Sequence, residues 1–112
     1  MRHIFRFAGG KAHKLNSIHP PLDSALVKSS IYHEPCVGGG SVALDVASRY
    51  RDHEIRLNDL YPDIYSVWHL VAEGSDQDFE TFLSLLSQKP SVELFAHVRS
   101  SRPTSEVERA FR

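Results

Sequence analysis

Three consecutive glycines, Gly38, Gly39 and Gly40, limit the folds open to this chain more than any other feature does. A short β-prone run, residues 30–33, precedes them, and a helical pattern opens at Ser41 directly after them. Because glycine has no Cβ, the backbone there can take positive φ and let a ligand lie against bare amides. Strand-to-helix crossings of this kind are where α/β folds bind nucleotides. The sequence therefore predicts an α/β fold with a ligand-binding loop, although a tight turn or a flexible connection fits the glycines alone equally well.

The composition excludes several classes of protein. The 112 residues suffice for one domain, and 41% hydrophobic with 24% charged residues is ordinary for a globular protein. The single cysteine, Cys36, cannot form an internal disulfide, and no apolar run approaches a membrane span or a signal-peptide core. The seven histidines show no i, i+4 pairing or metal-ligand spacing. We therefore expect a reducing, cytoplasmic setting, with no metal and no membrane partner.

Charge is unevenly distributed along the chain, although the net charge is only -1. Residues 1–30 hold five basic groups and one acidic group, whereas residues 31–98 hold four basic and eleven acidic groups. A basic arm ahead of an acidic middle is compatible with a face that meets phosphate. A solvated charge pattern with no partner explains it equally well.

The segment ahead of the glycine loop predicts a strand, a turn and two helical pieces. Residues 4–7 are β-prone and stop at a second bare-backbone turn, Gly9-Gly10. A helix is expected from Lys11, and Pro20-Pro21 should end it because proline has no N–H to donate and clashes with the preceding turn. Residues 22–27 then suggest a second short amphipathic piece.

The segment after the loop predicts a helix and then a strand. From Ser41 onward, apolar residues recur at helical spacing and define one core face. Residues 54–58 alternate polar and apolar side chains, which is typical of a half-buried strand, and Asn58-Asp59 ends it. The predicted core face of the helix comprises Ala43, Val46, Ala47 and Tyr50.

Three further amphipathic helices are predicted in the second half of the chain. Pro62 fits the first turn of one helix, which Gly74 stops. Asp76 can cap the next helix, which cannot continue past Pro90, and Ser91 can cap the third. Their predicted apolar stripes are Ile64, Val67, Trp68 and Val71, then Phe79, Phe82, Leu83 and Leu86, then Leu94, Phe95 and Val98.

The last residues predict the start of one more helix. Ser105 and Glu108 have the spacing of a capping box, and Val107, Ala110 and Phe111 begin an apolar face. So short a helix buries too little surface to offset its ordering entropy. We therefore expect these residues to be the front part of something longer.

Three sequence motifs occur in a fixed order along the chain. They are residues 7–11, Phe-Ala-Gly-Gly-Lys, residues 34–41, Glu-Pro-Cys-Val-Gly-Gly-Gly-Ser, and residues 58–64, Asn-Asp-Leu-Tyr-Pro-Asp-Ile. Together they resemble the N-terminal half of the adenine-specific DNA methyltransferases of the Dam type. Residues 95–99 and 108–111 also resemble helical segments that follow in this family, so the similarity covers nearly the whole chain. One motif alone is a weak signal, but three in the family's order are a strong one.

The resemblance implies an incomplete Rossmann-like α/β fold that binds S-adenosylmethionine. Residues 1–112 would be the N-terminal, cofactor-binding part of a catalytic domain, helix-rich after the second motif strand. The target-recognition region and the catalytic tetrapeptide Asp-Pro-Pro-Tyr are expected beyond residue 112, and that tetrapeptide does not occur in this sequence. We therefore expect no catalytic residue in this chain and no methyl transfer by the chain alone.

The intact enzyme would transfer a methyl group from S-adenosylmethionine to the exocyclic amino group of adenine in DNA. The resemblance implies double-stranded DNA as the partner of that full-length enzyme, which we expect to be a cytoplasmic monomer encoded by a bacterium or a phage. The alternative is a non-catalytic remnant or a small module that binds an adenosyl ligand without transferring a methyl group.

The glycine loop and two strand-end acids are the main candidate cofactor residues. The amides of Gly38, Gly39 and Gly40 can approach the cofactor, and the helix that starts near Ser41 offers its positive end to a carboxylate. Glu34, after the first motif strand, is placed to receive the methionyl ammonium group; its other interpretation is a solvated acid. Asp59 lies where Rossmann-like proteins place an acid on the ribose hydroxyls.

The first motif supplies the remaining candidates: Phe7, Ala8, Gly9 and Lys11. The resemblance implies that Phe7 packs on the cofactor and that Lys11 contacts its carboxylate or the target nucleotide. A core phenylalanine and a surface lysine are the alternatives. The sequence departs from the family at Phe7, where Trp or Tyr is common, and at Cys36, where Phe is usual. The small thiol is expected to leave a void or loosen the packing of the cofactor.

Overall fold

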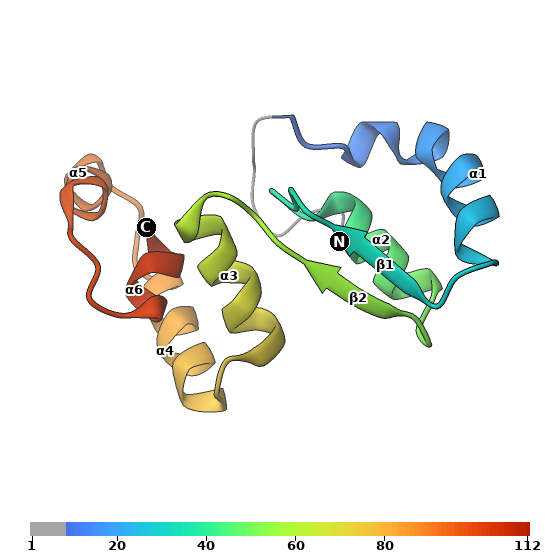
Figure 1. Cartoon of the computed structure of the whole chain (residues 1–112). Helices are drawn as coiled ribbons and strands as arrows, with labels where there is room; N and C mark the ends of the chain where they lie inside the picture. The colour runs from blue at the N-terminus through green and yellow to red at the C-terminus, as the bar shows by residue number, and fades with distance from the viewer. Residues whose placement is uncertain (1–8) are drawn as a thin grey trace. The chain divides into compact units, whose positions relative to one another are not determined.

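The structure is a computed structural model that describes residues 9–112. Its contacts divide the chain into two compact units, which we call the N-terminal unit (Met1–Asp59) and the C-terminal unit (Leu60–Arg112). Figure 1 shows the helices and strands of both units. The predicted strand over residues 4–7 lies outside the described residues, as do Phe7 and Ala8 of the candidate site.

Two short parallel strands form the sheet of the N-terminal unit. β1 (Ile31–Glu34) pairs with β2 (Glu54–Leu57) along their full lengths, with Glu34 opposite Leu57 at the last register position. The two strands lie side by side in Figure 1. α2 (Ser41–Arg49) forms the crossover that a parallel pair requires. The strands predicted over residues 30–33 and 54–58 are confirmed. The first is shifted by one residue, and the second ends one residue earlier than predicted.

The core of the N-terminal unit is a small apolar cluster between α2 and the helix ahead of the sheet. A 3-10 helix, η1 (Ala12–Lys14), leads into α1 (Leu15–Leu26). The buried centre of the cluster is Leu26, Val42 and Val46. Around it pack the partly buried side chains of Leu15, Ile18, Leu22, Tyr32, Tyr50 and Ile55.

The prediction that Pro20-Pro21 ends the first helix is wrong, because α1 continues through both prolines to Leu26. The two prolines deprive the carbonyls of Asn16 and Ser17 of their helical donors. All four of these residues are exposed, so water can hydrate those carbonyls. The fixed φ of proline is itself helical. The apolar face of α1 packs continuously on the core, and this packing outweighs the two lost hydrogen bonds.

The helix predicted from Ser41 is confirmed, with a small correction to its buried face. Ala43 and Val46 are buried and Tyr50 is half-buried, but Ala47 is exposed and Val42 is buried in its place. At 3.6 residues per turn, Val42, Val46 and Tyr50 fall within one narrow arc of the helix, whereas Ala47 lies at its edge. The larger side chains therefore determine which face turns inward.

Four helices make up the C-terminal unit. They are α3 (Pro62–Glu73), α4 (Asp76–Leu86), α5 (Val92–Ser100) and α6 (Glu106–Phe111), and all four were predicted. α6 packs against both α3 and α4. The buried apolar side chains of this unit are Val67, Trp68, Leu70, Phe82, Val107 and Ala110.

Several predicted core residues of the C-terminal unit are exposed instead. On α4 only Phe82 of the predicted stripe is buried, and on α5 no residue is fully buried. The exposed members of the predicted stripes are Val71, Phe79, Leu83, Leu86 and Phe95. Helical spacing identifies a face but does not say whether another element covers it. Within residues 9–112, no helix is long and apolar enough to cross a bilayer.

The helix caps mostly follow the prediction. Ser91 and Ser105 each accept the N–H three residues later, as expected. The cap of α4 is Ser75, whose hydroxyl accepts the N–H of Asp78, so the prediction of Asp76 is wrong by one position. The hydroxyl of Ser75 also donates to the carboxylate of Asp78 at 2.8 Å, so these two residues hold the helix start and Asp76 is the first residue of the helix.

Gly74 ends α3 as predicted, and a Cβ there would collide with the carbonyl of Leu70. The Glu108 carboxylate reaches back to the backbone of Ser105, as the predicted capping box requires, and also to Thr104 one residue earlier. Its carboxylate accepts the N–H and hydroxyl of Thr104 at 2.7 and 2.9 Å. These hydrogen bonds lower the pKa of the Glu108 carboxyl.

Candidate functional site

The glycine loop connects the end of β1 to the first turn of α2 and is held at three points. Gly38 and Gly40 have φ values of 49° and 69°, in the region that favours glycine. The N–H of Val37 donates to the carbonyl of Asn58 at 2.9 Å, and the N–H of Gly40 donates to the carbonyl of Val37 at 2.9 Å. The N–H of Gly38 donates to Oδ2 of Asp59 at 2.8 Å. The segment after β2 therefore fixes the shape of the loop.

Two backbone N–H groups at the end of the glycine motif differ from their neighbours in their hydrogen bonding. The backbone N–H groups of Gly39 and Ser41 have no hydrogen-bond acceptor within residues 9–112. Both residues are buried, and Ser41 is only 5% exposed. Ser41 is also the first residue of α2, where the helix concentrates partial positive charge. N–H groups at a helix start that lack an acceptor within residues 9–112 suit an anionic group of a ligand.

Glu34 occupies the last position of β1 and is half-buried. The hydroxyl of Tyr32 donates to Oε2 of Glu34 at 3.0 Å. Burial raises the pKa of the Glu34 carboxyl. The Tyr32 hydroxyl, the backbone N–H of Ala43 and the positive charge of Lys11 oppose that rise. Glu34 is thus a constrained carboxylate that faces the start of α2, and its interpretation as a fully solvated acid does not match this environment.

The two candidate carboxylates lie at the same edge of the sheet. Glu34 ends β1, and Asp59 follows β2 after a single intervening residue, Asn58. The N–H of Asn58 donates to the carbonyl of Glu34 at 3.0 Å, which continues the pairing of the strands to this point. Parallel strands place their carboxyl ends together, and this is where open α/β sheets bind ligands.

The described part of the first motif lies ahead of η1. Gly9 has a φ of 79°, and a Cβ there would meet nothing within 4 Å, so its backbone conformation rather than crowding favours glycine. Nζ of Lys11 donates to the carbonyl of Gly9 at 3.3 Å, and the charge of Lys11 acts on Glu34. Cys36 is exposed, so it opens no void in the protein's own core. Its effect on cofactor packing stays a prediction.

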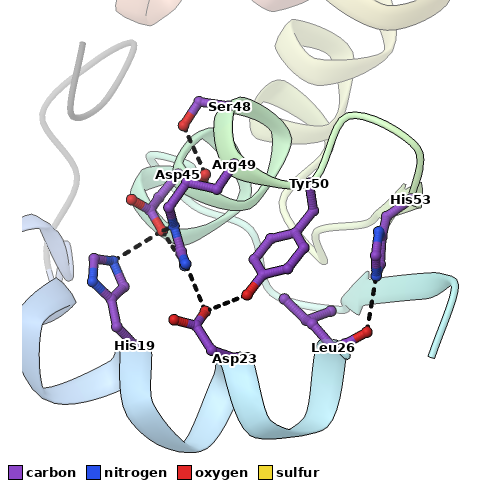
Figure 2. Close-up of polar contacts among 8 residues, drawn as sticks. All are labelled: His19, Asp23, Leu26, Asp45, Ser48, Arg49, Tyr50 and His53. Carbon is purple, nitrogen blue, oxygen red and sulfur yellow. Dashed lines mark hydrogen bonds and ion pairs between the residues drawn. The ribbon is translucent and has the colours of Figure 1, made fainter. Parts of the chain in front are cut away.

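A polar network between α1 and α2 was not predicted from the sequence, and Figure 2 shows it. Arg49 pairs with Asp23 at 2.6 Å and with Asp45 at 2.7 Å, and the hydroxyl of Tyr50 donates to Asp23 at 2.8 Å. Nε2 of His19 lies 3.0 Å from Oδ2 of Asp45. The hydrogen bond from Arg49 lowers the pKa of Asp23. The i, i+4 spacing of Asp45 and Arg49 was a visible signal, but the link to α1 depends on the tertiary fold.

The network borders an open cleft of about 390 Å³ between the first helices and α2. Its polar lining residues are His13, Asn16, His19, Ser41, Asp45 and Ser48. Ser41 is the residue that this cleft shares with the glycine motif. In the part of the chain that the structure describes, no group of three or more His, Cys, Asp or Glu side chains is arranged to hold a metal ion.

The N-terminal unit combines a parallel strand pair, a glycine loop at a helix start and an acid at the carboxyl end of each strand, an arrangement that nucleotide-binding α/β proteins share. Comparison with known families then identifies the class. The family model of the D12 class N6 adenine-specific DNA methyltransferases matches residues 7–112, and the chain belongs to this family.

A curated relative agrees with the family assignment. The chain is 30% identical over 84 residues to the Type II methyltransferase M.MjaIII of Methanocaldococcus jannaschii. The match covers 73% of this chain but only 29% of the relative. The chain therefore spans less than a third of the length of this relative.

Proposed function

We propose that this chain forms the S-adenosylmethionine-binding part of an adenine-specific DNA methyltransferase, with an incomplete Rossmann-like fold. The observation that carries the proposal is the tie between Asp59 and the N–H of Gly38, which joins the acid after β2 to the glycine loop after β1. Membership of the D12 class supports the same assignment. The intact protein would act on double-stranded DNA in the cytoplasm.

The donors and acceptors at this edge of the sheet fit the chemical groups of the cofactor. The buried N–H groups of Gly39 and Ser41 suit its carboxylate, and the carboxylate of Glu34 suits its ammonium group. Asp59 suits the ribose hydroxyls, because one carboxylate can accept from two donors. Lys11 adds positive charge close to Glu34. Phe7 and Ala8 complete the proposed set from outside the described residues.

S-adenosylmethionine, when bound, supplies a methyl group on a sulfonium sulfur. This chain's residues would bind and orient the cofactor: the loop amides and Glu34 would fix its amino-acid end, and Asp59 its ribose. These roles leave none of the candidate residues to hold a flipped adenine. We propose that an Asp-Pro-Pro-Tyr segment elsewhere in the intact protein does so, since the sequence of this chain does not contain one.

Titration calorimetry with S-adenosylmethionine and S-adenosylhomocysteine tests the cofactor assignment directly. We expect weak binding, because part of the pocket wall lies outside this chain in the proposed fold. Circular dichroism should first show that the chain is folded. If neither ligand binds at about millimolar concentration, the cofactor assignment is wrong.

A methyl-transfer assay separates the enzyme from its alternative, an adenosyl-binding module without activity. Labelled methyl incorporation into mixed-sequence DNA would be measured with this chain alone and with a protein extended through any downstream reading frame. We expect activity only in the extended protein, because transfer needs the target amine held in line with the methyl group. Activity of the short chain above a cofactor-site variant would contradict the proposed division of roles, and inactivity of both would favour the binding module.

A further inference from the structure

Tyr32 is a half-buried ionisable residue to which the proposed function assigns no role. Its side chain packs against the cluster of Leu26, Val42 and Val46. Its hydroxyl extends past this core and donates to Oε2 of Glu34 at 3.0 Å. The two residues stand at i and i+2 of β1, so both side chains lie on the same face of the strand.

Toward the carboxylate form of Glu34, the hydroxyl of Tyr32 acts as the donor. Burial, together with the adjacent charge of Glu34, raises the pKa of Tyr32 far above its usual value, so the phenol stays protonated. The ring is anchored in the core, which fixes the position of the hydroxyl. Glutamate has three side-chain torsions, and a fixed donor at its tip removes much of their freedom.

The surroundings of Glu34 show why a fixed donor matters there. From α2 it meets the backbone N–H of Ala43, from the segment ahead of η1 the charge of Lys11, and from its own strand Tyr32. On β2 its register partner is the apolar Leu57. Burial favours the protonated carboxyl, and these three groups favour the carboxylate. Removing one donor should therefore change the orientation of the Glu34 carboxyl and raise its pKa further.

We propose that Tyr32 is a positioning residue that holds the carboxylate of Glu34 so that it accepts the ammonium group of an amino-acid-bearing nucleoside. Tyr32 acts through Glu34 and does not itself touch the ligand. The pair thereby selects a nucleoside that carries an amino acid over the nucleoside alone. This inference rests on the proposed function, because it assumes that the ligand binds at this edge of the sheet.

Two probe ligands isolate the amino-acid end of the ligand. S-adenosylhomocysteine carries the ammonium and carboxylate groups, whereas 5′-methylthioadenosine keeps the adenosine and the thioether but lacks both. Tyr32→Phe keeps the ring in the core and removes only the hydroxyl. The matched control is Tyr50→Phe, which also removes a hydroxyl bound to a carboxylate in the same unit, that of Asp23.

The binding experiment compares both ligands with the parent chain and the two variants. Tyr32→Phe should weaken binding of S-adenosylhomocysteine by about tenfold, the usual effect of a lost hydrogen bond to a charged group, and leave 5′-methylthioadenosine unchanged. Tyr50→Phe should alter neither affinity. Equal loss of both ligands in Tyr32→Phe would show a merely structural role and overturn the proposal. If the parent binds neither ligand, the proposed function itself fails. If it binds both equally well, the amino-acid end of the ligand contributes nothing, so the contacts of Glu34 and of the loop amides fail while the adenosine contacts stand.

The protonation of Glu34 gives a second measurement that a packing defect would not reproduce. Carboxyl-carbon magnetic resonance would follow the titration of Glu34 in the parent and in Tyr32→Phe. The pKa of Glu34 should rise further in the variant, because a hydrogen bond that favours the charged form is lost. The acid limb of S-adenosylhomocysteine binding should move to higher pH with it. An unchanged Glu34 titration in a folded Tyr32→Phe variant would overturn the positioning role.

Discussion

The two units of this chain are similar in length but are held together by different interactions. In the N-terminal unit, polar groups fix the geometry: Asp59 ties the glycine loop, and Arg49 joins two acids from different helices. The C-terminal unit is four helices with a small apolar core. Of the large exposed apolar side chains within residues 9–112, Val27 and Ile31 belong to the N-terminal unit and the other nine to the C-terminal unit.

The N-terminal unit holds its candidate site residues in place by hydrogen bonds, whereas the C-terminal unit is held together mainly by apolar packing. All the described candidate cofactor residues lie in the N-terminal unit. There Glu34 accepts from Tyr32, Asp59 accepts from Gly38, and Lys11 donates to Gly9. The long-range polar contacts of the C-terminal unit include His69 with Glu106 at 3.0 Å and Arg112 with Asp63 at 3.9 Å, and these join its helices rather than a loop. We therefore expect substitutions of the candidate site residues in the N-terminal unit to act on ligand binding, and substitutions in the core of the C-terminal unit to act mainly on stability.

The largest expected effect comes from truncating Trp68, which is 6% exposed in the core of the C-terminal unit. Trp68→Ala should lower the free energy of unfolding by about 3–5 kcal/mol, as large-to-small substitutions in a core do. Hydrogen exchange should show the loss of protection mainly within residues 60–112. The control is Phe95→Ala, at a side chain that is 65% exposed. Equal loss of protection in both units would show that they unfold as one cooperative unit, and the proposed difference between them would be wrong.

The second prediction concerns Asp59, the link between the two motif segments of the N-terminal unit. Asp59→Ala removes the acceptor of the Gly38 N–H and the proposed ribose contact, and should weaken cofactor binding by about 1.5–3 kcal/mol. Asp59→Asn keeps an acceptor for Gly38 and should lose less. Asp63→Ala, the same change in the C-terminal unit, serves as the control. Calorimetry that gives equal affinity for Asp59→Ala and the parent would exclude Asp59 from the site.

A smaller effect is expected from Arg49, the centre of the network in Figure 2. Arg49→Met keeps most of the side-chain length but leaves Asp23 and Asp45 without their shared cation. The melting temperature should fall by a few degrees, and added salt should narrow the difference because the pairs are partly exposed. Arg99→Met, next to the ring of Phe95 in the C-terminal unit, is the matched control. A parent and variant that melt together at low salt would show that the network contributes nothing measurable.

The smallest expected effect is the pH dependence of the C-terminal unit. A hydrogen bond to Glu106 raises the pKa of His69, whose ring also stacks on Tyr65. A raised folded-state pKa means that the contribution to stability is complete below the unfolded value of about 6.5 and is lost as pH rises through the folded value. Unfolding experiments between about pH 5 and 8 should show this loss in the parent and a flatter profile in His69→Gln. The same slope in both proteins would contradict the assignment to His69.

Local sequence rules predicted the elements of this fold well. The glycine loop, the alternation in residues 54–58 and the serine caps at Ser91 and Ser105 each depend on near neighbours, and the structure confirms all of them. The failure at Pro20-Pro21 has the opposite cause. Local chemistry disfavours a helix there, but packing of Leu22 and Leu26 on α2 and its cluster overrides it.

The candidate site was predictable as a set of residues but not as a set of contacts. Motif order indicated Glu34, the glycines and Asp59, and their spacing on two strands implied one edge of the sheet. Nothing in the sequence showed that Asp59 would hold the N–H of Gly38 or that Tyr32 would hold Glu34, because both contacts depend on side-chain directions that only the folded chain sets. The predicted burial of the apolar stripes in the C-terminal unit was partly wrong for a related reason. Helical periodicity identifies an apolar face but does not show whether another element covers it.

The three hydrogen bonds that hold the glycine loop affect both the rate of ligand association and the selectivity of binding. The loop loses its conformational freedom during folding, so a ligand that docks there does not have to order it again. Association should then be a single kinetic step whose rate rises linearly with ligand concentration, without the plateau that a slow rearrangement would impose. The same stiffness makes the loop intolerant of ligands of another shape, since a backbone already fixed at Gly38 and Gly40 cannot move to accommodate them.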